Sequence, residues 1–521
     1  MGPTDQQNAS NGNSNSGDLA ISTAAPIAPE EGKTNDVQAQ SHETRSSSSN
    51  TSQAVGEVVD VSEKSSSENL GDAEKGQQHR HHAAPPYTPT EAEQVGEVNP
   101  FGHEDENAEM KYQTMSWWQV GLLMVAENIS LGVLSLPNAV ATIGLVPGII
   151  LTIFFGLMAM YCGYVIGQFF NKYPSTHTFA DAAFLMGGPI AREIMGVAQV
   201  LIIIFIMGAH VLSFSIALNV LTGHGTCTVV FGVVGLAVCL ALALKRQLEK
   251  VSYLSIASCL SVVICVLVAL IDIAIIRPEY GQAKAATSGV SLQNGMLATL
   301  QIILAFSGHH AFFTFCAELR DPRDFTKSVV FMEGVATIFY VIVGVVIYIY
   351  AGPDVLSPAL GSASPLVSKI AFGLALPTIV IAGVVNGHVA CKYIWVRMWR
   401  NNPARLHQKY GMSLISWVAI CTVLWIIAWI IAEAIPSFSL LISLISALFC
   451  SWFSFGFSGF LWLYMNRGRW TESWKKMLLA ALNVYVVIQG AVICGLGLYA
   501  SGEALSEGAQ GSAFSCADNS G

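Results

Sequence analysis

The sequence predicts an all-α membrane protein of about eleven transmembrane helices that follow a long polar tail. Hydrophobic residues make up 53% of the 521 residues and charged residues only 12%, which is about half the charged fraction of an ordinary soluble domain. The mean hydropathy is +0.52. The charges are also unevenly placed, because residues 1–114 are polar while the chain beyond Trp117 is a series of long apolar runs.

The N-terminal segment, residues 1–114, is rich in Ser, Asn, Gln, Glu and Gly. Such a segment cannot bury enough apolar surface to offset the entropy lost on ordering, so we expect a disordered tail. We see no cleavable signal peptide, because the first apolar run begins far downstream. The expected organisation is this tail, a transmembrane domain over 115–500 and a short C-terminal tail over 501–521.

The apolar runs are about 18–25 residues long, the length needed to cross ~30 Å of hydrocarbon. A segment over 177–189 carries Asp181 and the Gly187-Gly188-Pro189 breaker, so we expect a loop there. The predicted spans are 117–142, 145–170, 190–221, 228–244, 251–276, 293–317, 329–351, 366–396, 413–433, 437–465 and 475–500.

Lys and Arg in the short loops predict the orientation, because these residues stay on the cytoplasmic side. With the N-terminus inside, the inner loops hold seventeen of them and the outer segments only three, namely Arg277, Lys284 and Lys369. We therefore expect a cytoplasmic N-terminal tail, which offers sites for cytoplasmic regulators, and a non-cytoplasmic C-terminal tail. Cys227 and Cys516 fall in outer segments, where they could form a disulfide.

The first span holds Glu127, Asn128, Ser130, Gly132 and Pro137 within a few turns. Gly132 loosens a helix, and Pro137 lacks an N–H and clashes with the carbonyl four residues earlier. An interrupted helix is tolerated in a membrane only where protein or a watery cavity satisfies its backbone. The pattern predicts a broken helix beside a site.

The sixth span repeats this anomaly at Phe306-Ser307-Gly308-His309-His310. Spans one and six are the corresponding members of two five-helix halves. Interrupted segments at matching positions indicate a midplane site of an inverted-repeat transporter. Freed amides at a half-helix N-terminus can bind a carboxylate, and freed carbonyls can hold an ammonium or a coupling ion, an arrangement that suits an amino acid.

Two segments carry a specific resemblance. Gly132-Val133-Leu134-Ser135-Leu136-Pro137 resembles the G-V-L-x-L-P segment of the amino acid/auxin permease family, within the amino acid–polyamine–organocation superfamily. The segment from Glu318 to Lys327 is similar to that family's E-(M/L)-x-(D/N)-P-x-D-F-x-K signature. The match covers about 114–500, and the tail with its M-S-W-W-Q boundary looks most like fungal neutral and aromatic amino acid permeases.

The resemblance implies a 5+5 inverted repeat with broken helices 1 and 6 plus one extra helix, and uptake of amino acids coupled to protons or sodium. We expect substrate to bind at the two breaks, at Asn128, Ser130, Leu131, Gly132, Val133, Phe306, Ser307, Gly308 and His309. The family's Gly-His element favours His309 over His310. Family members usually have a small or polar residue where Glu127 stands, so a shared role is not assumed there.

Glu127, His309 and Asn386 are the candidates for proton coupling. A carboxylate at helix centre costs ~2.5–3.5 kcal/mol, so it normally faces a cavity or a partner. Burial favours its neutral form, and a His titrates near neutral pH. A purely structural role, with each side chain bonding a neighbouring helix, stays open for all three.

The expected function is proton-coupled symport of neutral amino acids, aliphatic and aromatic, across the plasma membrane, with the lipid bilayer as surroundings. No cofactor or metal is expected, the coupling ion is expected to be H⁺, and no basic face indicates nucleic acid. The chain lacks a Walker loop and a nucleophile-elbow motif, so ATP drive and hydrolytic catalysis are not expected. A vacuolar transporter of the same family and a non-transporting sensor with this fold remain alternatives.

Overall fold

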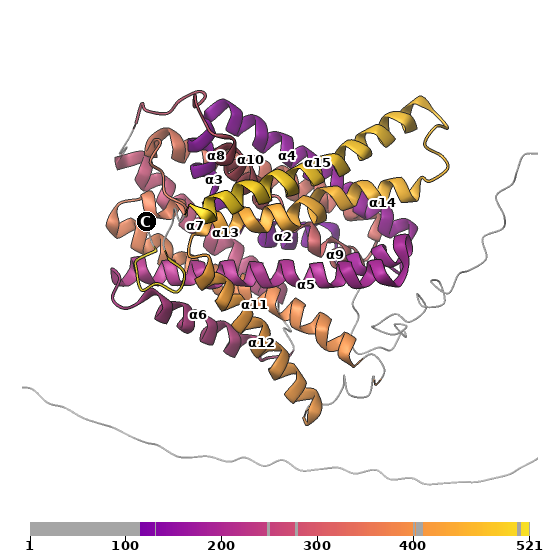
Figure 1. The fold of residues 1–521 in the computed structure, drawn as a ribbon, viewed down its shortest axis with the longest axis horizontal. Coiled ribbons are helices and arrows are strands. Elements are labelled where there is room, and N and C mark those ends of the chain that lie inside the picture. The colour runs from indigo at the N-terminus through magenta and orange to yellow at the C-terminus, as the bar shows by residue number, and fades with distance from the viewer. Residues whose placement is uncertain are drawn as a thin grey trace, which may run out of the picture. The chain divides into compact units, whose positions relative to one another are not determined.

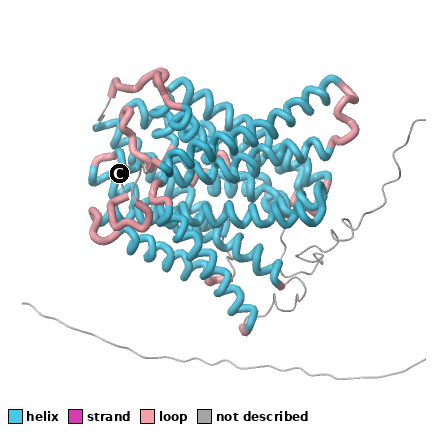
Figure 2. The backbone as a smooth tube through the Cα atoms, viewed as in Figure 1, coloured by secondary structure: helices cyan, strands magenta, loops and turns pink. Residues whose placement is uncertain are grey.

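The structure is a computed structural model, and it describes residues 115–130, 132–246, 251–276, 280–399, 402, 410–507 and 512–519. These residues are helical apart from loops and one isolated bridge between Met115 and Leu319. Figure 2 shows this helical backbone, with the loops gathered at two ends. The expected N-terminal tail and the expected site residue Leu131 lie outside the described residues.

The longer helices follow one another through the chain, and most of them run side by side (Figure 1). Their bounds are α2 (Trp117–Asn128), α3 (Leu136–Ile143), α4 (Leu145–Lys172), α5 (Phe179–Thr222), α6 (Thr228–Ala243), α7 (Val251–Ile276), α8 (Leu292–Ala305), α9 (Phe312–Glu318), α10 (Phe325–Ala351), α11 (Pro365–Met398), α12 (Met412–Ala434), α13 (Phe438–Ile445), α14 (Phe457–Met465) and α15 (Trp474–Ser506).

Each predicted span corresponds to one of these helices or to two consecutive ones that a short break or a π-helix separates. Among the described residues, nine stretches are long and apolar enough to cross a membrane, including Leu292–Glu318 and Phe438–Met465. The bent pair α2 and α3 forms a tenth, and α6 is a shorter apolar helix of 16 residues. The prediction of an all-α membrane protein with many spans is therefore confirmed, with ten candidate spans and the shorter helix α6 among the described residues.

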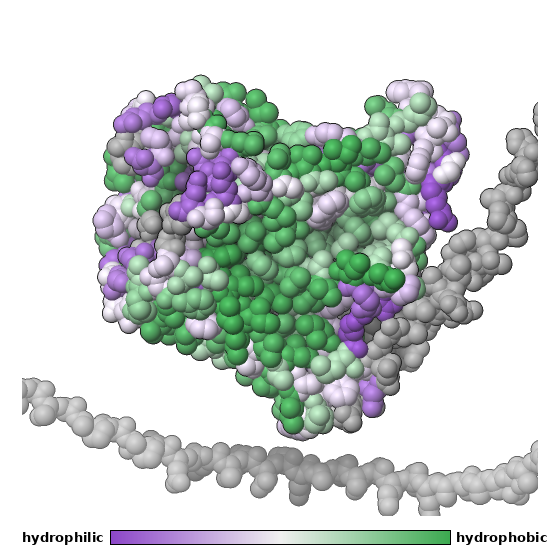
Figure 3. All heavy atoms as spheres, in the orientation of Figure 1, coloured by the Kyte–Doolittle hydropathy of each residue, from purple (hydrophilic) through white to green (hydrophobic). Residues whose placement is uncertain are grey.

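The outer faces of the helices are apolar, as a lipid-facing surface requires. Leu157 of α4, Ile194 of α5 and Ile275 of α7 are exposed by 60%, 66% and 72% of their surface. Figure 3 shows apolar residues across the middle of one face and hydrophilic residues gathered mainly toward its two ends. This distribution is what a chain that crosses a bilayer needs.

The two halves of the domain pack against each other helix by helix. α3 contacts α8, α4 contacts α10, α5 contacts α11 and α6 contacts α12. In each pair the second helix belongs to the span five positions later in the chain. This pairing is the arrangement expected of a 5+5 repeat, and α15 is the extra helix.

The segment 177–189 is not a loop, and our prediction there was wrong. Thr178 and Asp181 form a capping box that begins α5 at Phe179, with the Thr178 amide donating to Asp181 at 3.0 Å. Asp181 is thus a helix-start residue rather than a loop residue. The breaker acts only as a kink, because Gly188 adopts φ 71° and ψ −162° before Pro189 and the helix then continues.

The tenth span changes its helical pitch in the middle. Between α13 and α14 the residues Ser446–Gly456 form a π-helix, η6. Helices of this kind are rare and occur frequently at functional sites. η6 packs against α8, α15 and the second break described below.

The C-terminal residues fold back onto the helices at one end of the bundle. A disulfide joins Cys227 and Cys516, as the sequence had suggested. The Thr228 hydroxyl donates to the carbonyl of Ala517 at 2.6 Å, and the Phe514 amide donates to the carbonyl of Glu433 at 3.0 Å. We call this end the disulfide end, and the opposite one, where α9 stops, the Glu318 end.

Candidate functional site

The first break separates α2 from α3, whose axes differ by 48°. A 3-10 turn, η1 (Gly132–Leu134), lies between them. The Ser135 hydroxyl donates to the carbonyl of Gly132 at 2.9 Å, and Pro137 lies in the first turn of α3. Because the first turn of a helix needs no partner for its N–H groups, Pro137 here begins a new helix rather than distorting an old one.

The second break separates α8 from α9. α8 ends at Ala305, and a 3-10 turn, η2 (Gly308–Ala311), precedes α9. The Phe306 amide donates to the carbonyl of Ile303 at 3.1 Å, and the Ser307 hydroxyl donates to the carbonyl of Leu304. The last turn of α8 is therefore tightened and closed by its own residues, as is common at helix ends.

The two breaks lie against each other. A Cβ atom on Gly132 would lie 2.6 Å from Cα of Ala305, which is closer than real Cβ atoms come. A Cβ atom on Gly308 would lie 3.2 Å from Oδ1 of Asn128. Residues about 170 positions apart in the sequence are thus in contact, and Gly132 is required by this approach.

Glu127 and Asn386 are hydrogen-bonded partners across the same region. Nδ2 of Asn386, on α11, donates to Oε1 of Glu127 at 2.8 Å and to the carbonyl of Ala382 at 3.0 Å. The Asn386 side chain also interacts with the ring of His310, whose Nδ1 lies 3.3 Å from the carbonyl of Ser307. Glu127 is half-buried, whereas His310 and Asn386 are buried. α2, η2 and α11 therefore each contribute one polar side chain to a cluster that we call the Glu127 cluster.

His309 faces a different helix. Its Nε2 lies 2.9 Å from the carbonyl of Ala159 on α4, and its ring packs 4.3 Å from the ring of Phe312. Because a carbonyl only accepts, Nε2 is the protonated nitrogen in this arrangement. Of the two histidines, the structure brings His310 into the Glu127 cluster, although the resemblance had favoured His309.

Several expected substrate residues surround the contact between the breaks. The side-chain amide of Asn128 donates to the sulfur of Met332 at 3.4 Å, and the backbone carbonyl of Asn128 accepts from the Tyr340 hydroxyl at 3.0 Å. Val133 is fully buried. Phe306 packs 5.2 Å from the ring of Tyr340, on the side of α10.

Two buried oxygens in this region have no protein partner among the described residues. They are the hydroxyl of Ser130 and Oε1 of Gln199. Gln199, on α5, donates through Nε2 to the carbonyl of His310 at 3.3 Å. Buried polar atoms are nearly always paired, so these two oxygens are groups that a ligand can satisfy. Sequence reasoning missed Gln199, because one Gln in an apolar run is an ordinary feature of a membrane helix.

A second buried carboxyl group lies on α10. Glu333 is completely buried, and neither of its oxygens has a partner among the described residues. Cys162 of α4 and Tyr340 of α10 interact with it electrostatically. A buried carboxyl group without a hydrogen-bond partner is costly in free energy. Sequence reasoning missed Glu333, although it lies inside the predicted span 329–351.

The loop after α9 carries the family signature, and its bonds explain the pattern. Oδ1 of Asp321 accepts from the Arg323 amide at 3.0 Å and so begins a short turn that leads into α10. Asp324 pairs with Lys327 at 2.8 Å. The Arg320 amide donates to the carbonyl of Met115 at 2.9 Å, which ties the start of the domain to this loop.

The fold and the site together define a class, a multi-span membrane protein whose broken helices meet beside buried polar side chains. Residues 113–502 match the family model described as transmembrane amino acid transporter protein. The chain is 36% identical over 432 residues to the N amino acid transport system protein of Neurospora crassa, an alignment that covers 80% of this chain and 92% of that protein.

Two further relatives, each called a transmembrane transporter, come from Gibberella moniliformis and Fusarium pseudograminearum. They are 28% and 26% identical over 427 residues, and each alignment covers 79% of this chain and 89% of the relative. This chain belongs to the transmembrane amino acid transporter family. The predicted family is confirmed, and it is a family of transporters.

Proposed function

We propose that this protein is a secondary active transporter that moves neutral amino acids, aliphatic and aromatic, across the plasma membrane together with protons. The observation that carries the proposal is the contact between the two breaks beside the Glu127 cluster. A helix break in a membrane leaves backbone groups unsatisfied, and two breaks in contact place those groups in one position at mid-span.

The substrate's charged groups fit this position by their chemistry. The C-terminal end of α2 offers carbonyl groups for an ammonium, and the start of α3 offers amides for a carboxylate. The hydroxyl of Ser130 and Oε1 of Gln199 are buried and unpartnered there. Apolar residues such as Val133 surround the breaks and favour an uncharged side chain.

Coupling to protons is assigned to the Glu127 cluster. Glu127 is half-buried, and its bond to Asn386 persists whether the carboxyl is charged or neutral, because Asn386 is the donor. His309 is the second candidate named from the sequence, and His310 is the histidine that lies in the cluster. One proton driven by ~100 mV gains ~2.3 kcal/mol, and one pH unit adds ~1.4 kcal/mol. Together they support roughly several-hundred-fold accumulation.

We further propose that the N-terminus is cytoplasmic, which places the disulfide end outside. The excess of Lys and Arg on the other side supports this orientation, and a disulfide is stable in an oxidising compartment. A vacuolar transporter of this family would keep the same orientation relative to the cytosol. Locating a tagged chain in cells separates these two.

The deciding experiment is uptake into liposomes that contain the purified full-length chain. Radiolabelled L-leucine should accumulate when the outside is acidic, and a proton uncoupler should abolish this accumulation. Competition by the other amino acids then gives the side-chain preference. Binding of L-leucine without pH-driven accumulation would instead identify a sensor, and accumulation driven only by sodium would overturn proton coupling.

A further inference from the structure

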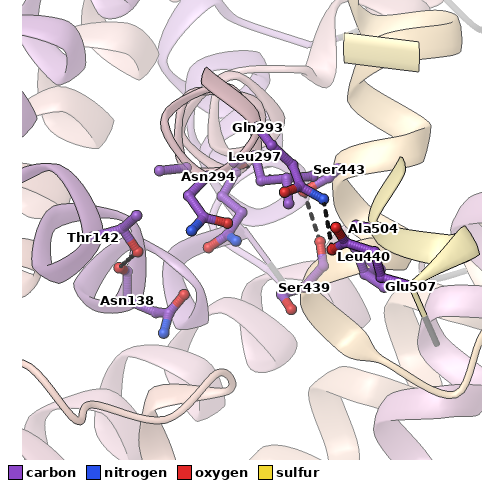
Figure 4. A pocket seen from close by; sticks show the side chains of 12 residues that line it. Asn138, Thr142, Gln293, Asn294, Leu297, Ser439, Leu440, Ser443, Ala504 and Glu507 are labelled. Carbon is purple, nitrogen blue, oxygen red and sulfur yellow. Dashed lines mark hydrogen bonds between the residues drawn. The ribbon is translucent and has the colours of Figure 1, made fainter. Parts of the chain in front are cut away.

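A polar cavity of about 280 Å³ opens at the disulfide end of the bundle. Four helices of the disulfide end form its walls, namely α3, α8, α13 and α15 (Figure 4). Its volume suits a small ligand rather than a drug-sized one. The cavity shares no lining residue with the Glu127 cluster.

Seven of the twelve residues that line this cavity carry uncharged hydrogen-bonding side chains, and four are apolar. Asn138 comes from α3, Asn294 and Gln301 from α8, and Ser443 from α13. Nε2 of Gln293 donates to Oε2 of Glu507 at 3.1 Å across the opening (Figure 4). Among the described lining residues, Glu507 is the one charged group.

Gln301 points to a ligand in this cavity. Its side chain is 4% exposed, and its Oε1 has no partner among the described residues. A buried amide oxygen of this kind is an acceptor that awaits a donor. Gln301 lies one turn before Ala305, the residue that meets Gly132, so the cavity reaches down almost to the contact between the breaks.

We propose that this cavity is a second binding site, which holds the ammonium group of a small neutral amino acid before the breaks separate. Oε1 of Gln301 and the carboxylate of Glu507 accept from the ammonium, and the amides of Asn138 and Asn294 are within the same lining to meet the carboxylate. The lining residues that the structure describes hold one negative charge and no cationic group, so a ligand with an ammonium group fits and a free anion does not. The amino acid nature of the ligand rests on the proposed function.

The test uses the full-length chain in lipid nanodiscs and a cysteine placed at Asn294, which lines the cavity. Its rate of modification is measured with two thiosulfonate reagents of similar size, one trimethylammonium and one sulfonate. A cysteine at Ser288, exposed on the loop before α8, is the matched control outside the cavity. We expect the ratio of the modification rates, cationic reagent to anionic reagent, to be about fivefold higher at position 294 than at position 288. Glu507→Gln should remove this difference.

Ligand binding is measured as protection of the same cysteine. Saturating L-alanine should slow modification at position 294 about tenfold, whereas propionate, which lacks the ammonium, should not. Gln301→Leu should abolish the protection. L-Alanine must still protect the cysteine at position 294 in Gly132→Leu, a variant in which the added side chain fills the space between the two breaks. If Gly132→Leu does not fold, Ser130→Phe is used in its place.

Absence of protection, or its loss in the break-blocked variants, would overturn the second site. Uptake of labelled L-alanine by the parent chain is measured in parallel. Uptake without protection refutes the second site and leaves the transport proposal standing. Protection without uptake supports the second site while it refutes transport.

Discussion

Nδ2 of Asn386 donates a 2.8 Å hydrogen bond to Oε1 of Glu127 and so joins the last turn of α2 to the middle of α11. The two residues are 259 positions apart in the chain. α2 ends at the first break, one residue after Glu127. The bond therefore links the protonation of the Glu127 carboxyl group to the position of α2. It is the part of the site that mutation can probe most directly.

Glu127→Gln should leave the protein folded and should remove most of the pH dependence of uptake. The Gln oxygen still accepts from Asn386, but the side chain can no longer bind or release a proton. For one coupled proton, each unit of pH gradient contributes about tenfold to accumulation in the parent chain, and we expect that contribution to vanish in the variant. L-leucine accumulation in liposomes at several pH gradients measures it.

The matched control for this variant is Glu193→Gln, on α5. Glu193 is an exposed carboxylate paired with Arg397 and far from the Glu127 cluster in the chain. It should retain the parent's response to pH. If Glu127→Gln also retained that response, the proton role of Glu127 would be refuted and His310 would become the next residue to test.

Glu472, in the loop before α15, should make no contribution to pH dependence in the physiological range. Arg469 and Lys476 hold the pKa of the Glu472 carboxyl near 2. The pKa of Glu472 is lower in the folded protein than its ordinary value near 4.5. The stability that the bonds of Glu472 to Arg469 and Lys476 contribute is therefore complete above about pH 4.5 and is lost as the pH falls through about 2. Glu472→Gln should therefore leave the uptake profile between about pH 5 and 8 unchanged. A shifted profile would show that another group near Glu472 titrates there.

Gly132→Ala should lower substrate affinity without unfolding the protein. The added Cβ atom would lie 2.6 Å from Cα of Ala305, so one of the two breaks must move. Overpacking of this kind costs about 1–3 kcal/mol, which corresponds to about five- to 150-fold in affinity. Equilibrium binding of labelled L-leucine to purified protein measures the loss.

Gly334→Ala, on α10, is the control for this substitution, because a Cβ atom there meets nothing within 4 Å. It should bind L-leucine as the parent does. Unchanged affinity in Gly132→Ala would mean that the ligand lies elsewhere.

Glu333→Leu should make the protein more stable. The carboxyl group is fully buried and both oxygens lack a partner among the described residues, so an apolar side chain of similar volume removes an unmet polar group. The expected gain is ~1–3 kcal/mol, seen as a rise of Tm by a few degrees in a thermal unfolding assay.

Ser328→Ala, one and a half turns earlier on the same helix, should have the opposite sign. The Ser328 hydroxyl donates to the carbonyl of Trp117 at 2.7 Å, and the substitution removes this bond between α10 and α2. A lower Tm in Glu333→Leu would show instead that the carboxyl is bonded in the folded protein.

The spans and the breaks could be predicted from the sequence because both follow from local chemistry. Apolar runs of sufficient length must be helical in lipid, and Gly132, Pro137 and Gly308 interrupt such runs. The exception was Asp181, whose pairing with Thr178 begins a helix where a loop had been expected. A polar residue such as Asp181 is common both in loops and at the start of helices, and its hydrogen bond with Thr178 decides between the two.

The partners of the site residues could not be predicted in this way. Nothing in the sequence links Glu127 to Asn386, and nothing directs the ring of His309 to Ala159 rather than to the breaks. Those pairings depend on how helices rotate about their axes when they pack. The π-helix η6 likewise depends on packing.

The contacts between corresponding helices of the two halves have a consequence for how the site could open to one side of the membrane and then to the other. α4 contacts α10 and α5 contacts α11, as we expect if the two halves are inverted repeats of one architecture. In an inverted repeat, exchange of the tilts of α2–α3 and α8–α9 would give a conformation of the site that is open to the opposite side of the membrane.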